Sequence, residues 1–306
     1  LYTEGSWQDG VQPAAGKGIL LDSSTALTLT ADYALAGLRP WSGTLILDGG
    51  SDLAVPKENG HIFFGAGAGR TAELDIPSGS MAFTSFSGAY YLQFGCYGGT
   101  GTGVIGGRAD ASGALSFLVG GMEVGNEKGI GAITVATNGV LWAKDWLRIG
   151  DRSGSGTMSI EAGGSVLSCS DSIIGALSGT GTVNVAGSFV VSNTLYIGEN
   201  SGVGTINVLP GGKVATTTLR PYNDAGTGNL SINGGTLQAV KSGTTIFTNV
   251  NFTVAAGGVT FDVGANVSGI VAANMQCLGS VVKTGDGTLI FADTGLATIA
   301  GDITVK

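Results

Sequence analysis

The chain has 306 residues, of which 56 are glycine, 6 are proline and 12% are charged, and its net charge is −8. Its glycines follow no three-residue period, which excludes a collagen triple helix. Hydrophobic residues make up 43% of the chain, too many for a disordered glycine-rich linker. The 14 lysines and arginines form no basic stripe, so we expect no nucleic-acid partner. No apolar run is long enough to span a bilayer directly as a helix.

The N-terminal stretch, residues 1–40, is irregular and holds one strand-like run, Ala26–Thr30. We expect this stretch to form a cap or irregular first coils, because an open end of stacked coils exposes unpaired backbone groups. Regular repeats occupy residues 60–306. We therefore expect residues 1–306 to form a single domain.

An apolar residue followed by glycine recurs along the repeats, and its glycines are 30, 30, 25, 25 and 23 residues apart. The pairs are Phe64-Gly65, Phe94-Gly95, Val124-Gly125, Ile149-Gly150, Ile174-Gly175 and Ile197-Gly198. A G-x-G-[T/A/N] string follows, ending at Ala132, Thr157, Thr182, Thr205 and Asn229. We interpret each string as a turn. A fixed step of this kind is typical of stacked coils in a solenoid.

Alternating apolar residues flank these strings, which predicts half-buried strands. We expect one set of side chains to point inward and form apolar ladders. This set comprises Leu147, Ile149, Ile160, Val185, Leu195, Ile197, Ile206 and Val208. The pattern predicts an all-β fold, a parallel β-helix with roughly 23–30 residues per coil. At ~4.8 Å per coil, roughly 11 to 12 coils give a body about 55 Å long.

The last residues, Asp302–Lys306, form a strand-like run with no turn behind it. A terminal coil leaves backbone groups unpaired along one edge, and such an edge pairs readily with another chain. We expect either further chain beyond Lys306 or weak end-to-end self-association.

Two strings, IGDRSGSGTMSIEAGGSV (149–166) and IGENSGVGTINVLPGGKV (197–214), resemble the repeat associated with type V secretion and PEP-CTERM proteins. The string VKTGDGTLIFADTGLATIAGDITV (282–305) is similar to the autotransporter-associated β-strand repeat. The resemblance covers roughly residues 60–306. It implies a right-handed β-helix that is secreted or associated with the bacterial cell surface or outer membrane. These families carry no catalytic residues that map onto this chain.

The densest charged and aromatic run offers the strongest contact surface for a carbohydrate. Its candidate residues are Trp142, Lys144, Asp145, Trp146, Arg148 and Asp151. A polysaccharide-cleaving site would need paired carboxylates from adjacent coils. Aligned by the repeat, Asp145 meets Ser170 and Asp151 meets Ala176, so we expect no acidic partner for either one. We assign no catalytic residue.

Other motifs support no cofactor and no metal site. The string Gly101–Gly106 matches GxGxxG, but a dinucleotide site needs a helix after it, and glycine turns follow instead. His61 is the only histidine, so no multi-histidine metal site can form. Cys96, Cys169 and Cys277 lack metal-ligand spacing, and we expect buried thiols.

These features favour a non-catalytic secreted or cell-surface repeat protein, such as a stalk, a passenger or an adhesin-like module. Its partner would be a glycan or another ligand on a host or cell surface. The alternative is a β-helix that binds or cleaves polysaccharide.

Overall fold

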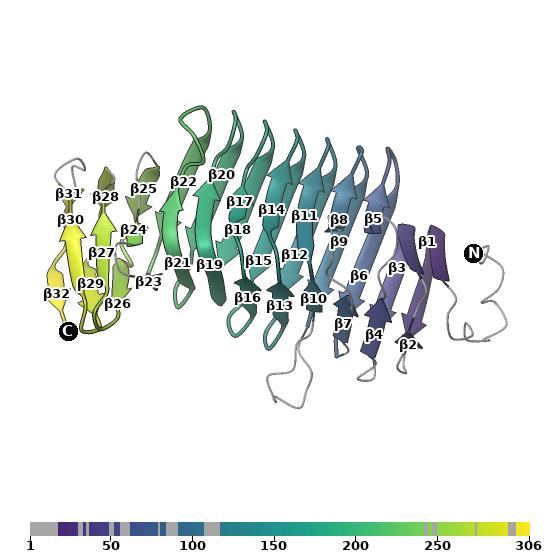
Figure 1. The fold of residues 1–306 in the computed structure, drawn as a ribbon, viewed down its shortest axis with the longest axis horizontal. Coiled ribbons are helices and arrows are strands. Elements are labelled where there is room, and N and C mark those ends of the chain that lie inside the picture. Colours follow the sequence, from purple (N-terminus) through teal and green to yellow (C-terminus); the bar gives the residue numbers. More distant parts are fainter. Residues whose placement is uncertain are drawn as a thin grey trace.

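The computed structural model describes residues 18–29, 33–34, 37–48, 52–55, 62–78, 80–83, 91–106, 117–241, 244–246, 250–272, 274–292 and 298–306. His61 and residues 1–17 of the expected cap lie outside the described residues. Within these ranges the regular structure is β-strand alone, and the strands pair in parallel. They stack along one axis from the N-terminal to the C-terminal end (Figure 1). The predicted parallel β-helix is confirmed.

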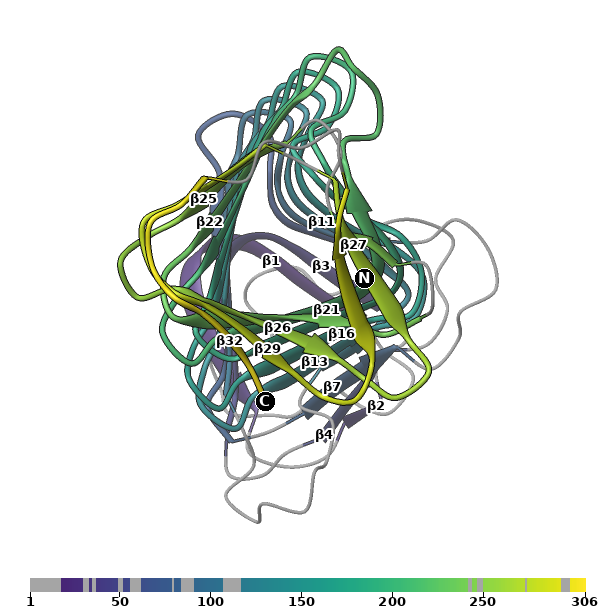
Figure 2. The same ribbon diagram turned by 90° about the vertical axis from the view of Figure 1, so that its left-hand side faces the viewer.

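Three faces enclose a roughly triangular interior when the stack is viewed along its axis (Figure 2). The first face is a 12-stranded sheet with one strand per coil. Its strands are β1 (Gly18–Leu29), β3 (Gly37–Leu47), β6 (Thr71–Ile76), β9 (Thr100–Ile105), β12 (Ile130–Val135), β15 (Ser155–Ile160), β18 (Thr180–Val185), β20 (Val203–Val208), β22 (Thr227–Ile232), β25 (Asn251–Val254), β28 (Met275–Cys277) and β31 (Thr298–Ile299).

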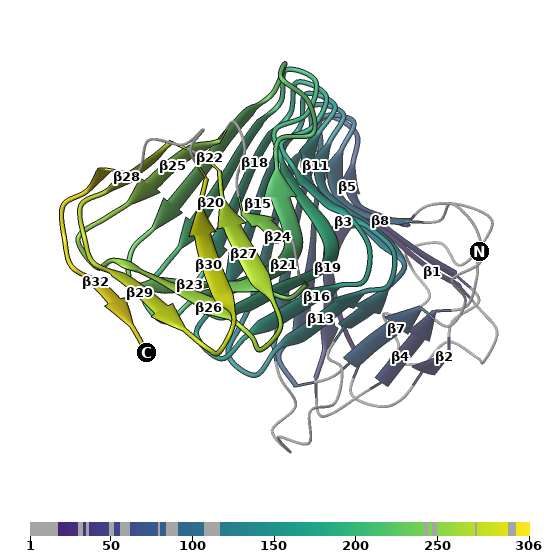
Figure 3. The same cartoon turned by 60° about the vertical axis from the view of Figure 1, so that its left-hand side comes forward.

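The other two faces belong to one 20-stranded sheet, because β19 and β21 run through both of them. The second face holds β2 (Tyr33–Ala34), β4 (Asp52–Val55), β7 (Ser80–Phe83), β10 (Phe117–Val119), β13 (Val140–Ala143), β16 (Ser165–Ser168), β19 (Ser188–Ile197), β21 (Lys213–Arg220), β23 (Gly235–Ala239), β26 (Val259–Val263), β29 (Val281–Thr284) and β32 (Ile303–Val305). The third face holds β5 (Ile62–Ala66), β8 (Tyr91–Cys96), β11 (Gly121–Asn126), β14 (Leu147–Asp151), β17 (Ser172–Ile174), β24 (Thr244–Ile246), β27 (Ser268–Val271) and β30 (Thr288–Phe291), with the ends of β19 and β21 between β17 and β24. Figure 3 shows the second and third faces meeting.

The register of the strands follows the apolar-glycine repeat. Phe64 pairs with Phe94, and the same row continues through Val124, Ile149, Ile174 and Ile197. Coils at the ends depart from the predicted length. The step is 19 residues from Gly18 to Gly37 and 22 from Asn229 to Asn251. The shorter step from Asn229 to Asn251 goes with a shorter strand on the first face, because β25 has 4 residues and β22 has 6.

Inward-pointing apolar residues fill the interior from Leu21 to Val281 as one cluster. Every member of the predicted inward set is buried, which confirms the register. Phe64 and Phe94 stack with ring centroids 4.9 Å apart at 12°. Burial of this apolar surface is the main force that holds the coils together.

A narrow corner joins the third face to the first, and we call it the arm. It comprises residues 66–70, 96–99, 126–129, 151–154, 176–179, 198–202 and 220–226. Most of its turns place two consecutive residues at positive φ, for example Glu127 and Lys128 at 47° and 67°. The chain therefore reverses within a few residues.

The G-x-G strings were wrongly interpreted as turns, because only their first glycine ends a turn and the second lies inside a strand. Gly156, for example, is the second residue of β15. A Cβ on Gly156 would lie 2.0 Å from the Val124 carbonyl oxygen, and one on Gly125 would lie 2.0 Å from the Ser155 carbonyl oxygen. The glycines equivalent to Gly125 thus face those equivalent to Gly156, at the place beside the arm where the two backbones come closest.

The C-terminal coil presents an open edge. β32 pairs with β29, and no further strand covers its other side among the described residues. Ile303 and Val305 are 59% and 71% exposed. The strand is confirmed, and self-association through it stays a prediction.

Candidate functional site

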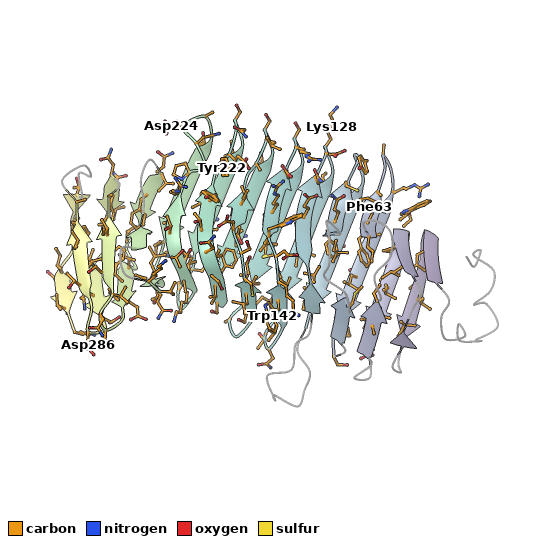
Figure 4. All side chains as sticks on the ribbon, viewed as in Figure 1. Phe63, Lys128, Trp142, Tyr222, Asp224 and Asp286 are labelled. Carbon is orange, nitrogen blue, oxygen red and sulfur yellow. The ribbon has the colours of Figure 1, made fainter. Side chains whose placement is uncertain are left out.

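The carbohydrate-contact residues lie around the corner between the second and third faces, except for Asp151. Trp142 belongs to β13, Lys144 and Asp145 are exposed in the turn that follows, and Trp146 precedes β14. Figure 4 places Trp142 at the opposite edge of the stack from the arm residue Lys128. Asp151 ends β14 inside the arm and is fully buried, so its side chain does not reach this surface.

Both tryptophan rings are engaged by the protein itself. The Lys144 ammonium lies 5.6 Å from the Trp142 ring centroid, and the indole N–H of Trp142 donates to Cys169 Sγ at 2.8 Å. The Arg148 guanidinium lies 5.2 Å from the Trp146 centroid, and the same ring contacts Gly121 of the preceding coil. Cations on the rings compete with a sugar for the surface on which it would stack. Cys169 is exposed, so the expectation of buried thiols holds for Cys96 and Cys277 alone.

A second cluster, which we call the polar row, lies where the third face meets the arm. It comprises Gln93, Glu123, Asn126, Arg148 and Asp151. Glu123 Oε2 accepts hydrogen bonds from the side-chain amides of Gln93 and Asn126. Arg148 Nη1 and Asp151 Oδ2 form an ion pair at 3.0 Å. The row draws on β8, β11 and β14, one strand from each of three consecutive coils, and the Gln93–Glu123 hydrogen bond joins the first two.

Gly125 explains how side chains three positions apart meet. Its φ of +72° breaks the alternation of β11, so Glu123 and Asn126 come to the same side and hydrogen-bond. Gly150 has the same φ and does the same for Arg148 and Asp151. At the aligned position of the preceding coil Asp151 meets Asn126, which is not acidic, and Glu123 pairs with Arg148. The charge of Asp151 nevertheless acts on Glu123 from the adjacent coil, so the expectation that Asp151 has no acidic partner fails for this off-register neighbour.

Burial dominates the electrostatics of the polar row. Burial raises the pKa of the Glu123 carboxyl to about 7, and the charge of Asp151 raises it further, while Arg148, the Gln93 hydrogen bond and Arg152 oppose the shift. Burial also raises the pKa of the Cys96 thiol to about 12, helped by the charges of Glu127 and Glu123. Glu123 thus changes its protonation near neutral pH.

The carboxylates of the polar row are closed to solvent, although the Arg148 side chain is 31% exposed. Glu123 is 3% exposed and Asp151 is fully buried. One oxygen each of Gln93, Asn126 and Asp151 has no hydrogen-bond partner among the described residues. A polymer in solution cannot reach these carboxylates without opening the arm. The arrangement therefore suits holding coils together better than acid-base chemistry on a glycan.

No group of three or more histidine, cysteine, aspartate or glutamate side chains among the described residues is arranged to hold a metal ion. No helix in the described part of the chain has the length and apolar character to cross a bilayer.

Sequence reasoning also missed an aromatic group on the arm. Tyr196 and Tyr222 have ring centroids 4.9 Å apart at 63°, and Arg220 lies over the Tyr196 ring at 5.2 Å. These residues come from adjacent coils, 24 to 26 positions apart in the sequence. The sequence signal was the loss of the apolar-glycine pair, because Pro221 and Tyr222 stand where Ile197 and Gly198 stand one coil earlier.

In comparisons with known proteins, no family model, no curated protein and no solved structure matches the chain.

Proposed function

We propose that this chain is a non-catalytic β-helix that serves as a stalk, passenger or adhesin-like module at a cell surface. The observation that carries the proposal is the burial of the polar row. Its buried carboxylates and amides lie between consecutive coils, with Gln93 of β8 bonded to Glu123 of β11, and the carboxylates are closed to a substrate. Its ionisable groups thus contribute to the scaffold.

The shape of the molecule supports the same proposal. A parallel stack presents each coil's turns in rows along an elongated body, which suits display of repeated surface features (Figure 1). The place at a cell surface rests on the resemblance of residues 149–166, 197–214 and 282–305 to secretion-associated repeats.

Turnover assays test the absence of catalysis. The purified chain is incubated with neutral and acidic polysaccharides, and both reducing ends and unsaturated products are measured. We expect no product above that of a heat-inactivated sample. Product that disappears in Asp145→Asn or Glu123→Gln would replace the proposal with the polysaccharide-cleaving alternative.

A further inference from the structure

The arm changes its sequence and its course at one coil. Residues 220–226 have the same length and register as residues 196–202 of the coil before, but Pro221 and Tyr222 replace the apolar-glycine pair Ile197-Gly198. This turn projects beyond its neighbours in Figure 1, and Figure 4 places Tyr222 and Asp224 on it. The backbone N–H of Tyr222 donates to the Gly198 carbonyl at 3.0 Å, which ties the turn to the coil before it.

This coil displays an aromatic surface with a fixed geometry. Tyr222 is 47% exposed and meets Tyr196 edge to face. Arg220 Nη2 donates to Tyr196 Oη at 3.3 Å, so the guanidinium holds the inner ring. The outer ring, Tyr222, therefore stands on a rigid base with much of its surface open to solvent.

Hydrogen-bonding groups surround the two rings. The Asn200 backbone N–H donates to Asn223 Oδ1 at 3.1 Å, and the Asn223 amide donates back to Asn200 Oδ1. Glu199 is buried beside them, with one oxygen accepting from Asn200 Nδ2 at 3.3 Å. Its other oxygen, Oε2, is buried and has no hydrogen-bond partner among the described residues. The Glu199 carboxyl interacts with the charges of Arg148 and Asp151 in the polar row, and like Asp151 it is buried.

We propose that Tyr196, Arg220, Tyr222 and Asn223 form a binding site for a neutral glycan. A sugar ring has an apolar C–H face that stacks on an aromatic ring and a rim of hydroxyl groups that both donate and accept hydrogen bonds. Tyr222 supplies the stacking surface, and Arg220 and Asn223 supply hydrogen-bonding groups.

Other ligand classes fit this surface less well. Arg220 is the only cation among the proposed residues and Asp224 follows it in the same turn, so an anionic polymer gains little net attraction. An extended peptide has no edge to join, because β21 and β22 already pair with strands on both sides. The inference rests on the proposed function, since it gives the scaffold a ligand class.

Binding by the purified full chain tests the inference. A glycan array of neutral glucans, galactans, mannans and xylans, with uronate polymers alongside, identifies a neutral oligosaccharide for calorimetry. We expect Tyr222→Ala to weaken binding by at least about tenfold and Tyr222→Phe to retain it. Tyr97→Ala is the matched control, because Tyr97 is a 52% exposed tyrosine in another turn of the same arm, and it should bind as the parent does.

The unfolding midpoint of each variant shows that it is folded. Absence of binding to every neutral glycan, binding to uronates alone, or equal loss in Tyr222→Ala and Tyr97→Ala would overturn the inference and leave the scaffold proposal standing. Binding followed by cleavage would overturn the scaffold proposal and leave the glycan site standing.

Discussion

Glu123 should make the stability of the stack depend on pH near neutrality. Its pKa rises from 4.5 to about 7 on folding, so the folded chain holds this proton more tightly than the unfolded chain does. The stabilisation is complete below pH ~4.5 and is lost as the pH rises through about 7. A difference of about 2.5 pKa units corresponds to about 3 kcal/mol.

The variant Glu123→Gln keeps the shape and one acceptor oxygen while fixing the neutral state. Its free energy of unfolding should equal that of the parent at pH 4 and exceed it by about 3 kcal/mol at pH 8. Urea unfolding at both pH values measures the difference without adding salt. Glu161→Gln controls for removal of an exposed turn carboxylate. A difference between Glu123→Gln and parent that stays constant from pH 4 to pH 8 would refute the reasoning.

Three other changes test the packing and the surfaces. Gly150→Ala places a Cβ 2.1 Å from the Thr180 carbonyl oxygen, at a backbone φ of +72°. Gly211→Ala is the control, because φ is also positive there, at +78°, but no atom lies within 4 Å of the added Cβ. Both should lose about 1–2 kcal/mol to the left-handed backbone, and Gly150→Ala should lose about 1–3 kcal/mol more; equal midpoints in urea would contradict the close approach. Ile197→Ala, at a fully buried position, should lose about 2–4 kcal/mol in the same assay, and an unchanged midpoint would contradict the register. The exposed edge at β32 should make the sedimentation coefficient rise with protein concentration, and Val305→Lys should reduce this rise, because a charge opposes edge pairing; a constant coefficient in the parent would contradict it.

The sequence predicted the coil stack because its strongest signals are periodic. Each coil repeats an apolar residue before glycine, so the row from Phe64 to Ile197 could be aligned by spacing alone. The inward set followed from two-residue alternation. The G-x-G strings were wrongly assigned to turns because the sequence does not distinguish a glycine in a turn from a glycine that allows two backbones to approach closely.

The polar row was harder to predict because it departs from both the two-residue alternation of the strands and the repeat of the coils. Glu123 occupies an outward position of β11, where alternation predicts solvent exposure, yet the left-handed Gly125 brings the arm over it. The charges of Glu123 and Asp151 interact off-register between adjacent coils, so aligned positions do not show the pair. The Tyr196 and Tyr222 pair was missed because Tyr222 stands at the position of Gly198, where the repeat predicts a glycine.

Labelling of intact cells that produce the protein tests the proposed role most directly. An antibody against the exposed turns of the arm, such as residues 126–129 and 151–154, is applied before and after permeabilisation. The proposal predicts full labelling of unpermeabilised cells, with loss of signal after external protease treatment. Labelling that appears only after permeabilisation would contradict a surface scaffold.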